Sequence, residues 1–493
     1  MKHKSYLIFS LILVFVLAYY NYFKGYADIK QPIWDEQYHI PAAEKYLEGV
    51  AFLDSHPPLG KMLLALGEYI LKPNQNVDKS TFLDKNHLLV FPEGFNYSGF
   101  RFLPAMCSVL SACLFLLIFY QISGHLVISF LFTLFYVFEN SFIVHSRVAT
   151  TDSIQVFLIL SSILYFIYTF KQKGHIDIYK YVLLAIMVGF CATVKLTGLI
   201  GVLLFIPLFI RERYKIIISF KKHSQKIKKK LILDLTRKVI LVIISLTLTV
   251  CAIFYLHISL GKKNLESQKY PLPERYVKLI NENRQSSLIN FPYTLSVNVN
   301  FMLNYNKNVT TRLKYDREEP GSHPLTWLVG GKAPAYSYFK KKDKVVNLIP
   351  VGNPVFWLGC LLGLFLTITL VFGKFIYGIK INNTFYFSLL TSILFLYLSY
   401  MAVMLKIDRV MYLHHYYIPL FFTFILSFII FNYLFEELLA SKDRVVYSSL
   451  LLLILQSVIC FYYFYPLTYR QEMSRYEFKQ RMWIEAWGLE HGK

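Results

Sequence analysis

The chain has 493 residues, of which 55% are hydrophobic and 17% aromatic, and its formal net charge is +22. Apolar runs of about 20 residues recur along it, which is long enough to cross the roughly 30 Å hydrocarbon core of a bilayer. This pattern excludes a soluble globular protein, and open sheets are excluded in lipid. The basic residues cluster in short segments between apolar runs, which argues against nucleic acid as a partner. We therefore predict an all-α integral membrane protein.

The N-terminal segment 5–23 is the first predicted span. Its charged start and apolar run have the look of a signal peptide, but no small-x-small cleavage site follows, so we predict an uncleaved membrane helix. A long polar segment, 24–98, comes next.

Ten further apolar segments predict a total of about eleven spans. They lie near residues 99–120, 126–145, 152–170, 180–197, 198–210, 238–259, 354–373, 384–404, 415–434 and 446–466. The fifth and sixth spans of the chain share a break at "KLTG", after Val194.

Short basic segments set the predicted orientation. The most basic is 211–238, with eleven Lys or Arg against two acids, which we interpret as a solvated topogenic loop. With eleven spans it shares one side with Lys2 and Lys4, and the positive-inside rule makes that side cytoplasmic.

The opposite, extracytoplasmic side then receives the larger polar segments. These are the first outer loop 24–98, a second outer loop 260–352, and a tail 467–493 that follows a single polytopic domain, 1–466. The second outer loop is basic, with 15 Lys or Arg against 7 acids, which suits a surface that handles something anionic.

Ionisable side chains gather at the edges of the spans on the predicted outer side. Such groups are costly near lipid and mark function by default. They are Asp35, Glu36, His56, Lys61, Arg101, Glu139, Arg147, Asp152, Lys195, Asp408, Arg409, His414 and His415.

Group transfer from a phosphate-linked lipid would use this combination of charges. Cations hold the phosphate and stabilise the charge that develops as it leaves, while a carboxylate accepts the proton of the attacking hydroxyl. One base suffices for an inverting displacement, because the phosphate is already a good leaving group and needs no dedicated acid to protonate it. The six cysteines fall inside apolar runs without the spacing of ligands, so we predict no metal site; a need for a divalent ion stays open.

Four stretches carry a recognisable order of motifs. The Asp35-Glu36 pair is followed by "HPPLGK" at 56–61, and "ENSFIVHSRVATTDS" at 139–153 has an acid-Asn, Ser-Arg and Asp-Ser pattern. "ATVKLTGL" at 192–199 and "YLHHYYIPL" at 412–420 complete the order. Together these stretches resemble the protein O-mannosyltransferase family of GT-C membrane glycosyltransferases.

The resemblance implies a GT-C fold, a polyprenyl-phosphate hexose donor, typically mannose, a Ser or Thr hydroxyl of an exported protein as acceptor, and inversion at the sugar carbon. Asp35 would be the base, with Glu36 beside it to position donor or acceptor, and Arg147 and Asp152 would shape the site. From charge and position, we extend donor-phosphate binding to a set of cations. They are His56, Lys61, Arg101, Arg147, Lys195 and Arg409. Glu139, His414 and His415 complete the predicted surroundings of the site.

The second outer loop departs from eukaryotic members of the family. They carry a β-trefoil domain there, whereas this loop has only about 93 residues and no three-fold repeat, as in bacterial members. We accordingly expect a bacterial cytoplasmic membrane with the site facing outward.

Several alternatives stay open at this point. The acceptor could be a lipid or a surface glycan, with a sugar or aminosugar transferred, and a transporter or flippase is a rival of another class. Asp35 could only cap a helix, and "HPPLGK" could be a rigid turn. Glu139 and Arg147 could form a structural ion pair, and His414 and His415 could be interfacial residues.

Overall fold

The computed structural model describes residues 2–172, 174–307, 321–341 and 344–489. The chain forms two compact units. Unit 1 comprises Met1–Tyr26, Ser108–Val148 and Thr310–Lys493, and unit 2 comprises Ala27–Cys107 and Ala149–Val309. Parts of the predicted second outer loop and the last four residues of the tail lie outside the described residues.

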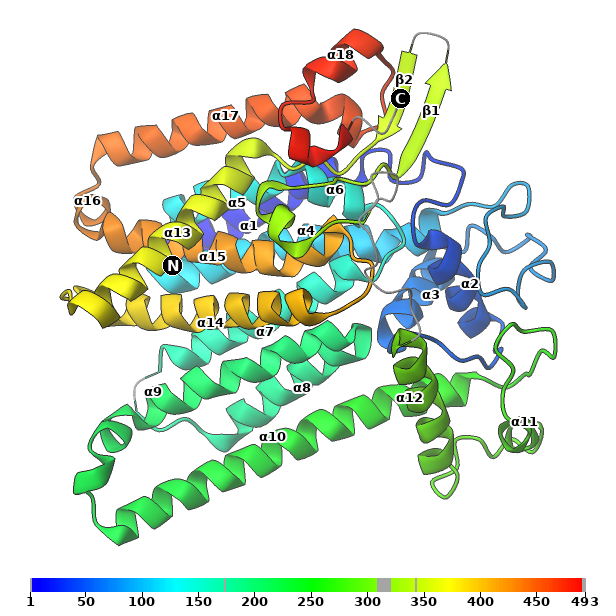
Figure 1. The fold of residues 1–493 in the computed structure, drawn as a ribbon, viewed down its shortest axis with the longest axis horizontal. Coiled ribbons are helices and arrows are strands. Elements are labelled where there is room, and N and C mark those ends of the chain that lie inside the picture. The colour runs from blue at the N-terminus through cyan, green and yellow to red at the C-terminus, as the bar shows by residue number, and fades with distance from the viewer. Residues whose placement is uncertain (1, 173, 308–320, 342–343, 490–493) are drawn as a thin grey trace. The chain divides into compact units, whose positions relative to one another are not determined.

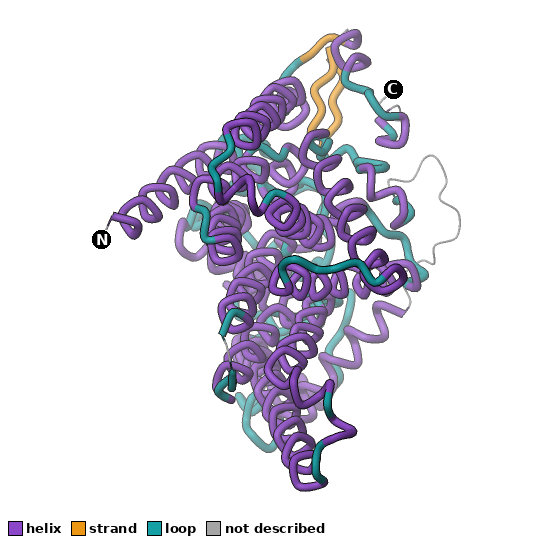
Figure 2. The backbone as a smooth tube through the Cα atoms, turned by 90° about the vertical axis from the view of Figure 1, so that its left-hand side faces the viewer, coloured by secondary structure: helices purple, strands orange, loops and turns teal. Residues whose placement is uncertain are grey.

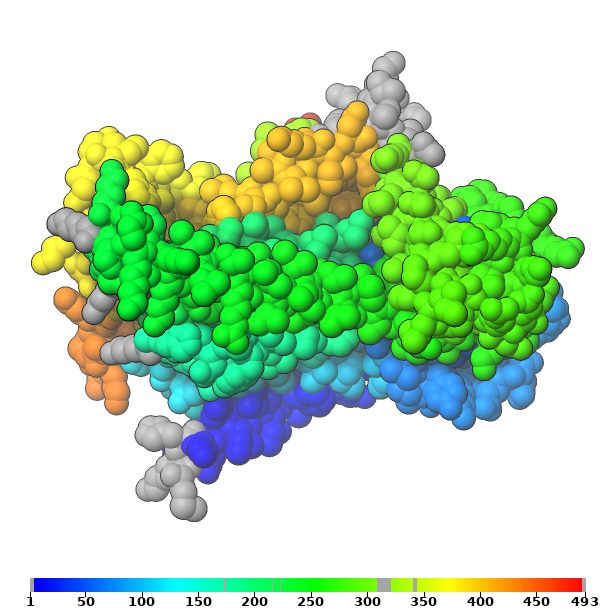
Figure 3. Space-filling view, turned by 90° about the horizontal axis from the view of Figure 1, so that it is seen from below, coloured from blue at the N-terminus to red at the C-terminus, as the bar shows by residue number. Residues whose placement is uncertain are grey.

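Unit 2 is helical, and α8 lies between α7 and α10 at its centre (Figure 1). Its elements are α2 (Glu36–Leu47), α3 (Leu59–Leu71), α7 (Asp152–Phe170), α8 (Ile178–Val194), η1 (Leu196–Leu204), α9 (Phe205–Ile218), η2 (Phe220–Lys222), α10 (Gln225–Leu260), α11 (Glu274–Asn281) and α12 (Phe291–Lys307). The 36-residue α10 is about 54 Å long at 1.5 Å per residue, and Figure 3 shows it exposed as a continuous green band.

Unit 1 is built around α15, which packs between α13 and α14. Its elements are α1 (Lys2–Phe23), α5 (Leu126–Val137), α6 (Asn140–Ser146), η3 (Pro324–Val329), α13 (Pro354–Tyr377), α14 (Thr384–Lys406), η4 (Leu413–Tyr416), α15 (Tyr417–Leu434), α16 (Glu436–Ala440), α17 (Arg444–Thr468), α18 (Arg475–Gln480) and η5 (Glu485–Trp487). Helix α4 (Ser98–Ser123) begins in unit 2 and continues into unit 1, where the Phe119 ring stacks on that of Phe428 with centroids 4.2 Å apart.

Polar caps fix where the apolar helices of unit 1 begin. The side chain of Asn353 accepts a hydrogen bond from the Val355 amide at the start of α13, and Pro354 occupies the first turn, where its missing amide hydrogen costs nothing. Asn383 and Asp443 cap α14 and α17 in the same way. Each cap satisfies amides that the helix itself leaves without a partner.

A small antiparallel sheet is the exception to the predicted all-α architecture, and Figure 2 shows how little of the described chain it takes up. Strand β2 (Lys344–Leu348) pairs with β1 (Ser337–Lys341) on one side and with β3 (Met473–Ser474) on the other. Strand β3 belongs to the predicted tail, so the tail and the second outer loop fold together rather than apart.

Each of the eleven predicted spans coincides with helix. Among the described residues, eight helices are long and apolar enough to cross a membrane, or up to nine if α5 and α6, which meet at 64°, count as one span. Helix α8 has only 17 residues and η1 starts the next segment as a 3-10 helix. Between them Lys195 is extended (φ −146°, ψ 147°), which confirms the break predicted at "KLTG".

The segment 211–238, predicted to be a solvated topogenic loop, is mostly helical in the structure. Helix α9 reaches Ile218 and α10 begins at Gln225, so most of this basic segment is helical. Lysine and arginine are good helix formers, and an apolar span can continue as a charged helix beyond the membrane. Residues 24–98, predicted as a first outer loop with helical structure, contain α2 and α3.

Candidate functional site

Glu36 and Arg101 form a fully buried ion pair at the start of α2 in unit 2. Arg101 Nε lies 2.7 Å from Glu36 Oε1, and Arg101 Nη2 lies 2.7 Å from Oε2. Both side chains are 0% exposed. The same carboxylate accepts the amides of Ile33 at 2.7 Å and Ala149 at 2.8 Å. A fork-to-fork pair with further donors is the geometry that makes a buried charge pair tolerable.

Asp35 directly precedes this pair and is half-buried. It occupies the N-cap position of α2, but its carboxylate makes no capping hydrogen bond. Its main-chain oxygen accepts the amides of Tyr38 and His39. The residue before it, Trp34, has φ 53°, a left-handed conformation that is uncommon for a bulky residue and is seen at functional sites. The capping alternative therefore does not explain Asp35.

The "HPPLGK" stretch includes a carboxylate partner that the sequence analysis missed. Asp54 Oδ1 accepts Lys61 Nζ at 2.6 Å and the His56 amide at 2.9 Å. Burial alone would raise the pKa of Asp54, but the adjacent Lys61 ammonium outweighs burial and holds that pKa below its usual value. Lys61, which was predicted to bind phosphate, is thus already paired with a carboxylate. The position of Asp54 two residues before "HPPLGK" was the feature of the sequence that could have suggested this partner.

Close packing brings Lys61, Asp152 and Lys195 into one region of unit 2. A Cβ atom on Gly60 would lie 2.6 Å from Thr151 Cγ2 and 3.2 Å from Val194 Cγ1, so only glycine fits there. Each of these three residues immediately precedes one of the charged residues, so Lys61, Asp152 and Lys195 come from adjoining segments, and both lysines lie close enough to His39 to act on it. Lys195 Nζ lies 2.7 Å from Asp152 Oδ1, with both side chains largely buried.

His39 is a further polar residue of this region that the sequence analysis missed. It is 3% exposed, and its Nδ1 lies 3.1 Å from the Ala149 carbonyl oxygen. Burial, together with repulsion from Lys61, His56 and Lys195, lowers the pKa of His39 well below 6.5. Its position four residues after Asp35, on the same side of a helix, was the signal that could have found it.

We call the nine charged and histidine residues of unit 2 described above the Asp35 cluster. It consists of Asp35, Glu36, His39, Asp54, His56, Lys61, Arg101, Asp152 and Lys195.

The remaining predicted site residues belong to unit 1. Glu139 caps α6, because its carboxylate accepts the amides of Ser141 and Phe142, and it also accepts Trp357 Nε1 at 3.1 Å. Arg147 donates to the main-chain oxygens of Ile143, Lys24 and Thr468, and its guanidinium carbon lies 4.5 Å from the centre of the Tyr469 ring. Glu139 is therefore held as a helix cap.

His414 and His415 form part of an aromatic stack in η4. The His414 ring stacks on His415 with centroids 4.4 Å apart and on His145 with centroids 5.3 Å apart. His145 Nδ1 in turn lies 2.6 Å from the Tyr336 hydroxyl. Arg409 is half-buried in the turn after α14. Among the residues that the structure describes, no three His, Cys, Asp or Glu side chains are placed to hold a metal ion.

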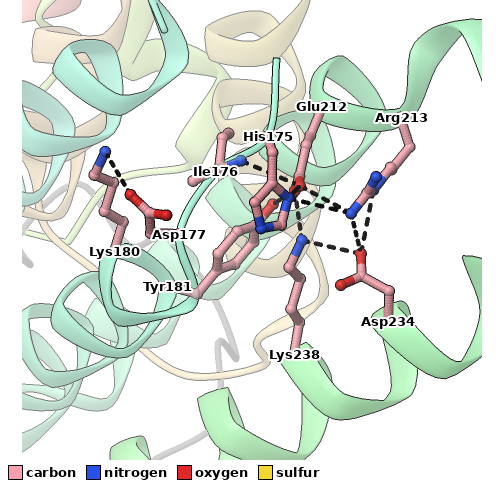
Figure 4. A network of polar contacts seen from close by, with 9 residues as sticks. All are labelled: His175, Ile176, Asp177, Lys180, Tyr181, Glu212, Arg213, Asp234 and Lys238. Atoms are coloured by element: carbon pink, nitrogen blue, oxygen red, sulfur yellow. Dashed lines mark hydrogen bonds and ion pairs between the residues drawn. The ribbon is translucent and has the colours of Figure 1, made fainter. Parts of the chain in front are cut away.

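A second buried ion-pair network lies in unit 2 at the other end of α8 (Figure 4). Glu212, whose side chain is 0% exposed, accepts Lys238 Nζ at 2.6 Å and the Tyr181 hydroxyl at 2.8 Å. Asp234 accepts both Lys238 and Arg213. We call Glu212, Arg213, Asp234, Lys238 and Tyr181 the Glu212 network; it joins α8, α9 and α10.

Two family descriptions match this chain. Residues 10–260 match the dolichyl-phosphate-mannose-protein mannosyltransferases, and residues 295–487 match the C-terminal four-transmembrane region of protein O-mannosyltransferase.

Relatives from animals and fungi are similar over shorter stretches. Protein O-mannosyl-transferase 2 of Danio rerio is 27% identical over 208 residues, which is 40% of this chain and 26% of that protein. Dolichyl-phosphate-mannose–protein mannosyltransferase 3 of Saccharomyces cerevisiae is 31% identical over 130 residues, 26% of this chain and 16% of that protein. The matches thus span about a quarter or less of these relatives' length.

A solved structure shares the fold over nearly the whole chain. It is that of the S. cerevisiae protein O-mannosyltransferase Pmt1-Pmt2 complex bound to the sugar donor, with a TM-score of 0.75 at 14% identity, covering 99% of this chain and 93% of that one. Since one of the matching family descriptions alone takes in more than half of the residues, the chain belongs to the dolichyl-phosphate-mannose-protein mannosyltransferase family.

Proposed function

We propose that this protein transfers mannose from a polyprenyl-phosphate carrier to a Ser or Thr hydroxyl of a protein. Family membership supports the donor and the reaction class. The observation that carries the assignment of the site is the environment of Asp35: a half-buried carboxylate that does not cap its helix and directly adjoins a fixed, buried ion pair. A positioned carboxylate of this kind is what a general base requires.

In the proposed reaction, Asp35 accepts the proton of the acceptor hydroxyl. The hydroxyl oxygen forms a bond to the anomeric carbon of the sugar while the bond from that carbon to the phosphate oxygen breaks. The products are the O-mannoside, with inverted configuration, and polyprenyl phosphate, which takes the bonding electron pair. The proton on Asp35 then passes to the phosphate or to water.

Glu36 and Arg101 act as positioning residues in this proposal. Both side chains are fully buried, and each is held by several partners, so neither is suited to contact a substrate. Arg101 also donates to the main-chain oxygens of Ile29 and Gln31, which fixes the segment leading to Asp35. The bidentate pair thereby holds the start of α2 in place.

The predicted phosphate-binding cations stay part of this proposal. In unit 2, Lys61 and Lys195 each carry a carboxylate partner, which orients the ammonium but also reduces its net charge. In unit 1, Arg147 is oriented by main-chain carbonyls. His56 and Arg409 stay in the predicted phosphate-binding set, and Asp152, His414 and His415 in its surroundings.

The Asp35 cluster is proposed to face the extracytoplasmic side of a bacterial cytoplasmic membrane. Lys195 follows the last residue of α8, whereas Tyr181 and the basic α9–α10 segment lie toward its first residue. If the basic segment is cytoplasmic, as the positive-inside rule requires, the Lys195 end of α8 is on the other side. A site there has access to lipid-linked sugars rather than to cytosolic nucleotide sugars.

A transfer assay tests this function directly. Purified protein is incubated with polyprenyl-phosphate mannose and either a Ser/Thr-containing peptide or a membrane lipid, and the products are analysed by mass spectrometry. A mass increase of one hexose on the peptide is the expected result. Transfer to lipid alone would replace the proposed acceptor, and movement of the donor lipid across vesicles without transfer would favour a flippase.

A further inference from the structure

The contact of His39 with a main-chain carbonyl identifies which ring nitrogen donates. A carbonyl oxygen can only accept a hydrogen bond, so the 3.1 Å contact between His39 Nδ1 and the Ala149 oxygen places a hydrogen on Nδ1. The ring is buried and lies near the ammonium groups of Lys61 and Lys195, with the His56 ring edge-on at 6.4 Å. A second proton would add another positive charge to these surroundings.

Ala149 is held at both of its backbone polar groups by one face of α2. Its amide donates to Glu36 Oε1 at 2.8 Å, while its carbonyl accepts from His39. Glu36 and His39 are three residues apart and so lie on the same side of the helix. The two contacts together form a clamp between α2 and the bend before α7, which we call the Ala149 clamp.

The bend that the clamp holds carries other members of the Asp35 cluster. Thr151 packs against Gly60 and begins the turn into α7, and Asp152 pairs with Lys195. Asp35 lies at the other side of the clamp, one residue before Glu36. Any shift of the bend relative to α2 would therefore change the separation of the proposed base from the Asp152–Lys195 pair.

We infer that His39 is a positioning residue for the proposed transfer: its Nδ1–H group holds the Ala149 carbonyl and so sets Asp35 in register with Asp152 and Lys195. The inference rests on the proposed function. It does not require His39 to exchange protons or to touch the sugar. Because misplacement by about 1 Å can cost on the order of 100-fold in rate, a single buried hydrogen bond of this kind matters for catalysis.

Two substitutions separate positioning from general packing. His39→Leu fills the buried space but cannot donate a hydrogen bond, whereas the amide nitrogen of His39→Asn can take the place of Nδ1. We expect His39→Leu to lower kcat on the order of 10-fold or more, with the KM for polyprenyl-phosphate mannose nearly unchanged. His39→Asn should recover most of kcat. Rates are normalised to folded protein from size-exclusion chromatography and thermal unfolding.

Hydrogen exchange provides a measurement that does not depend on turnover. In His39→Leu, exchange should rise in peptides covering residues 149–156 and stay unchanged in peptides from the middle of α8, while His39→Asn should resemble the wild type. Equal kcat for both variants and the wild type, or unchanged exchange at 149–156 in His39→Leu, would overturn the inference. Absence of transfer in the wild type would instead contradict the proposed function. In that case the hydrogen-exchange result at residues 149–156 would still test whether His39 holds the Ala149 clamp.

Discussion

The Asp35 cluster and the Glu212 network are both partly buried, both rich in ion pairs, and located toward opposite ends of α8. In the Glu212 network every charge comes from a helix, and the two acids share the same lysine, so three helices are joined through it. In the Asp35 cluster the charges lie at helix starts and in bends, and three cations, Lys61, Arg101 and Lys195, each pair with a carboxylate of their own. Asp35 adjoins the Glu36–Arg101 pair without capping its helix.

This difference shows that buried charge does not identify a catalytic site by itself. Structural ion-pair networks also place ionisable groups in apolar surroundings. What distinguishes the Asp35 cluster is an acid at a helix start that does not cap its helix and adjoins a fully buried ion pair, together with the left-handed backbone at Trp34. The comparison leads to predictions in which one region governs turnover and the other governs only stability.

The largest effect is expected from Arg101→Ala. This change leaves Glu36 buried without its charge partner, which costs on the order of 3–5 kcal/mol and removes the support of Asp35. We expect a large drop in unfolding temperature in detergent and loss of transfer by the protein that remains folded. Arg101→Lys, which keeps the charge but not the fork, should be intermediate. If Arg101→Ala had the unfolding temperature and the transfer rate of the wild type, the positioning role would be contradicted.

Glu212→Gln should affect stability alone. The amide keeps the shape of the side chain but removes the charge that Lys238 contacts, and hydrogen bonds to charged groups are worth about 1.5–3 kcal/mol. Thermal unfolding should therefore shift to lower temperature, while turnover per folded molecule stays within about twofold of wild type. A selective loss of turnover without a stability change would show that the two regions do not differ as described.

A smaller effect is expected from Glu44, which lies on α2 beyond the Asp35 cluster and pairs with Lys79 at 2.9 Å. Burial raises the pKa of Glu44 to about 7. The folded state thus binds this proton more tightly than the unfolded state, so the stability that Glu44 contributes falls as pH rises from about 4.5 to about 7. Thermal unfolding across this range should be flatter with pH in Glu44→Gln than in the wild type. An identical slope would mean that Glu44 titrates normally.

The sequence predicts the helical spans well, because length and hydropathy decide them locally. The break at Lys195 is confirmed, whereas eight or nine helices of the described residues, not eleven, are long and apolar enough to cross a membrane. The helical structure within 211–238 was not predicted, because charge density does not reveal whether a basic segment is helical. The strand pairing of β2 with β3 joins residues far apart in the chain, so no local pattern could predict it.

Within the candidate site, residue types were easier to predict than partners. The sequence singles out Glu36, Arg101, Lys61 and Lys195, but their pairings depend on distant packing, such as the close approach of Gly60 to Thr151. His39 and Asp54 were missed because neither stands at the edge of an apolar run. Their importance becomes visible only when a hydrogen-bond partner is known.

The most direct test of the central claim is single-turnover transfer by Asp35→Asn. Asparagine keeps the size of the side chain but cannot act as a base, so mannose transfer from polyprenyl-phosphate mannose to a peptide should fall at least about 100-fold. Binding of the donor, measured on the same preparation, should stay within about threefold of wild type, because Asp35 is not assigned to the phosphate. Transfer by Asp35→Asn at nearly the wild-type rate would contradict the assignment of Asp35 as the base.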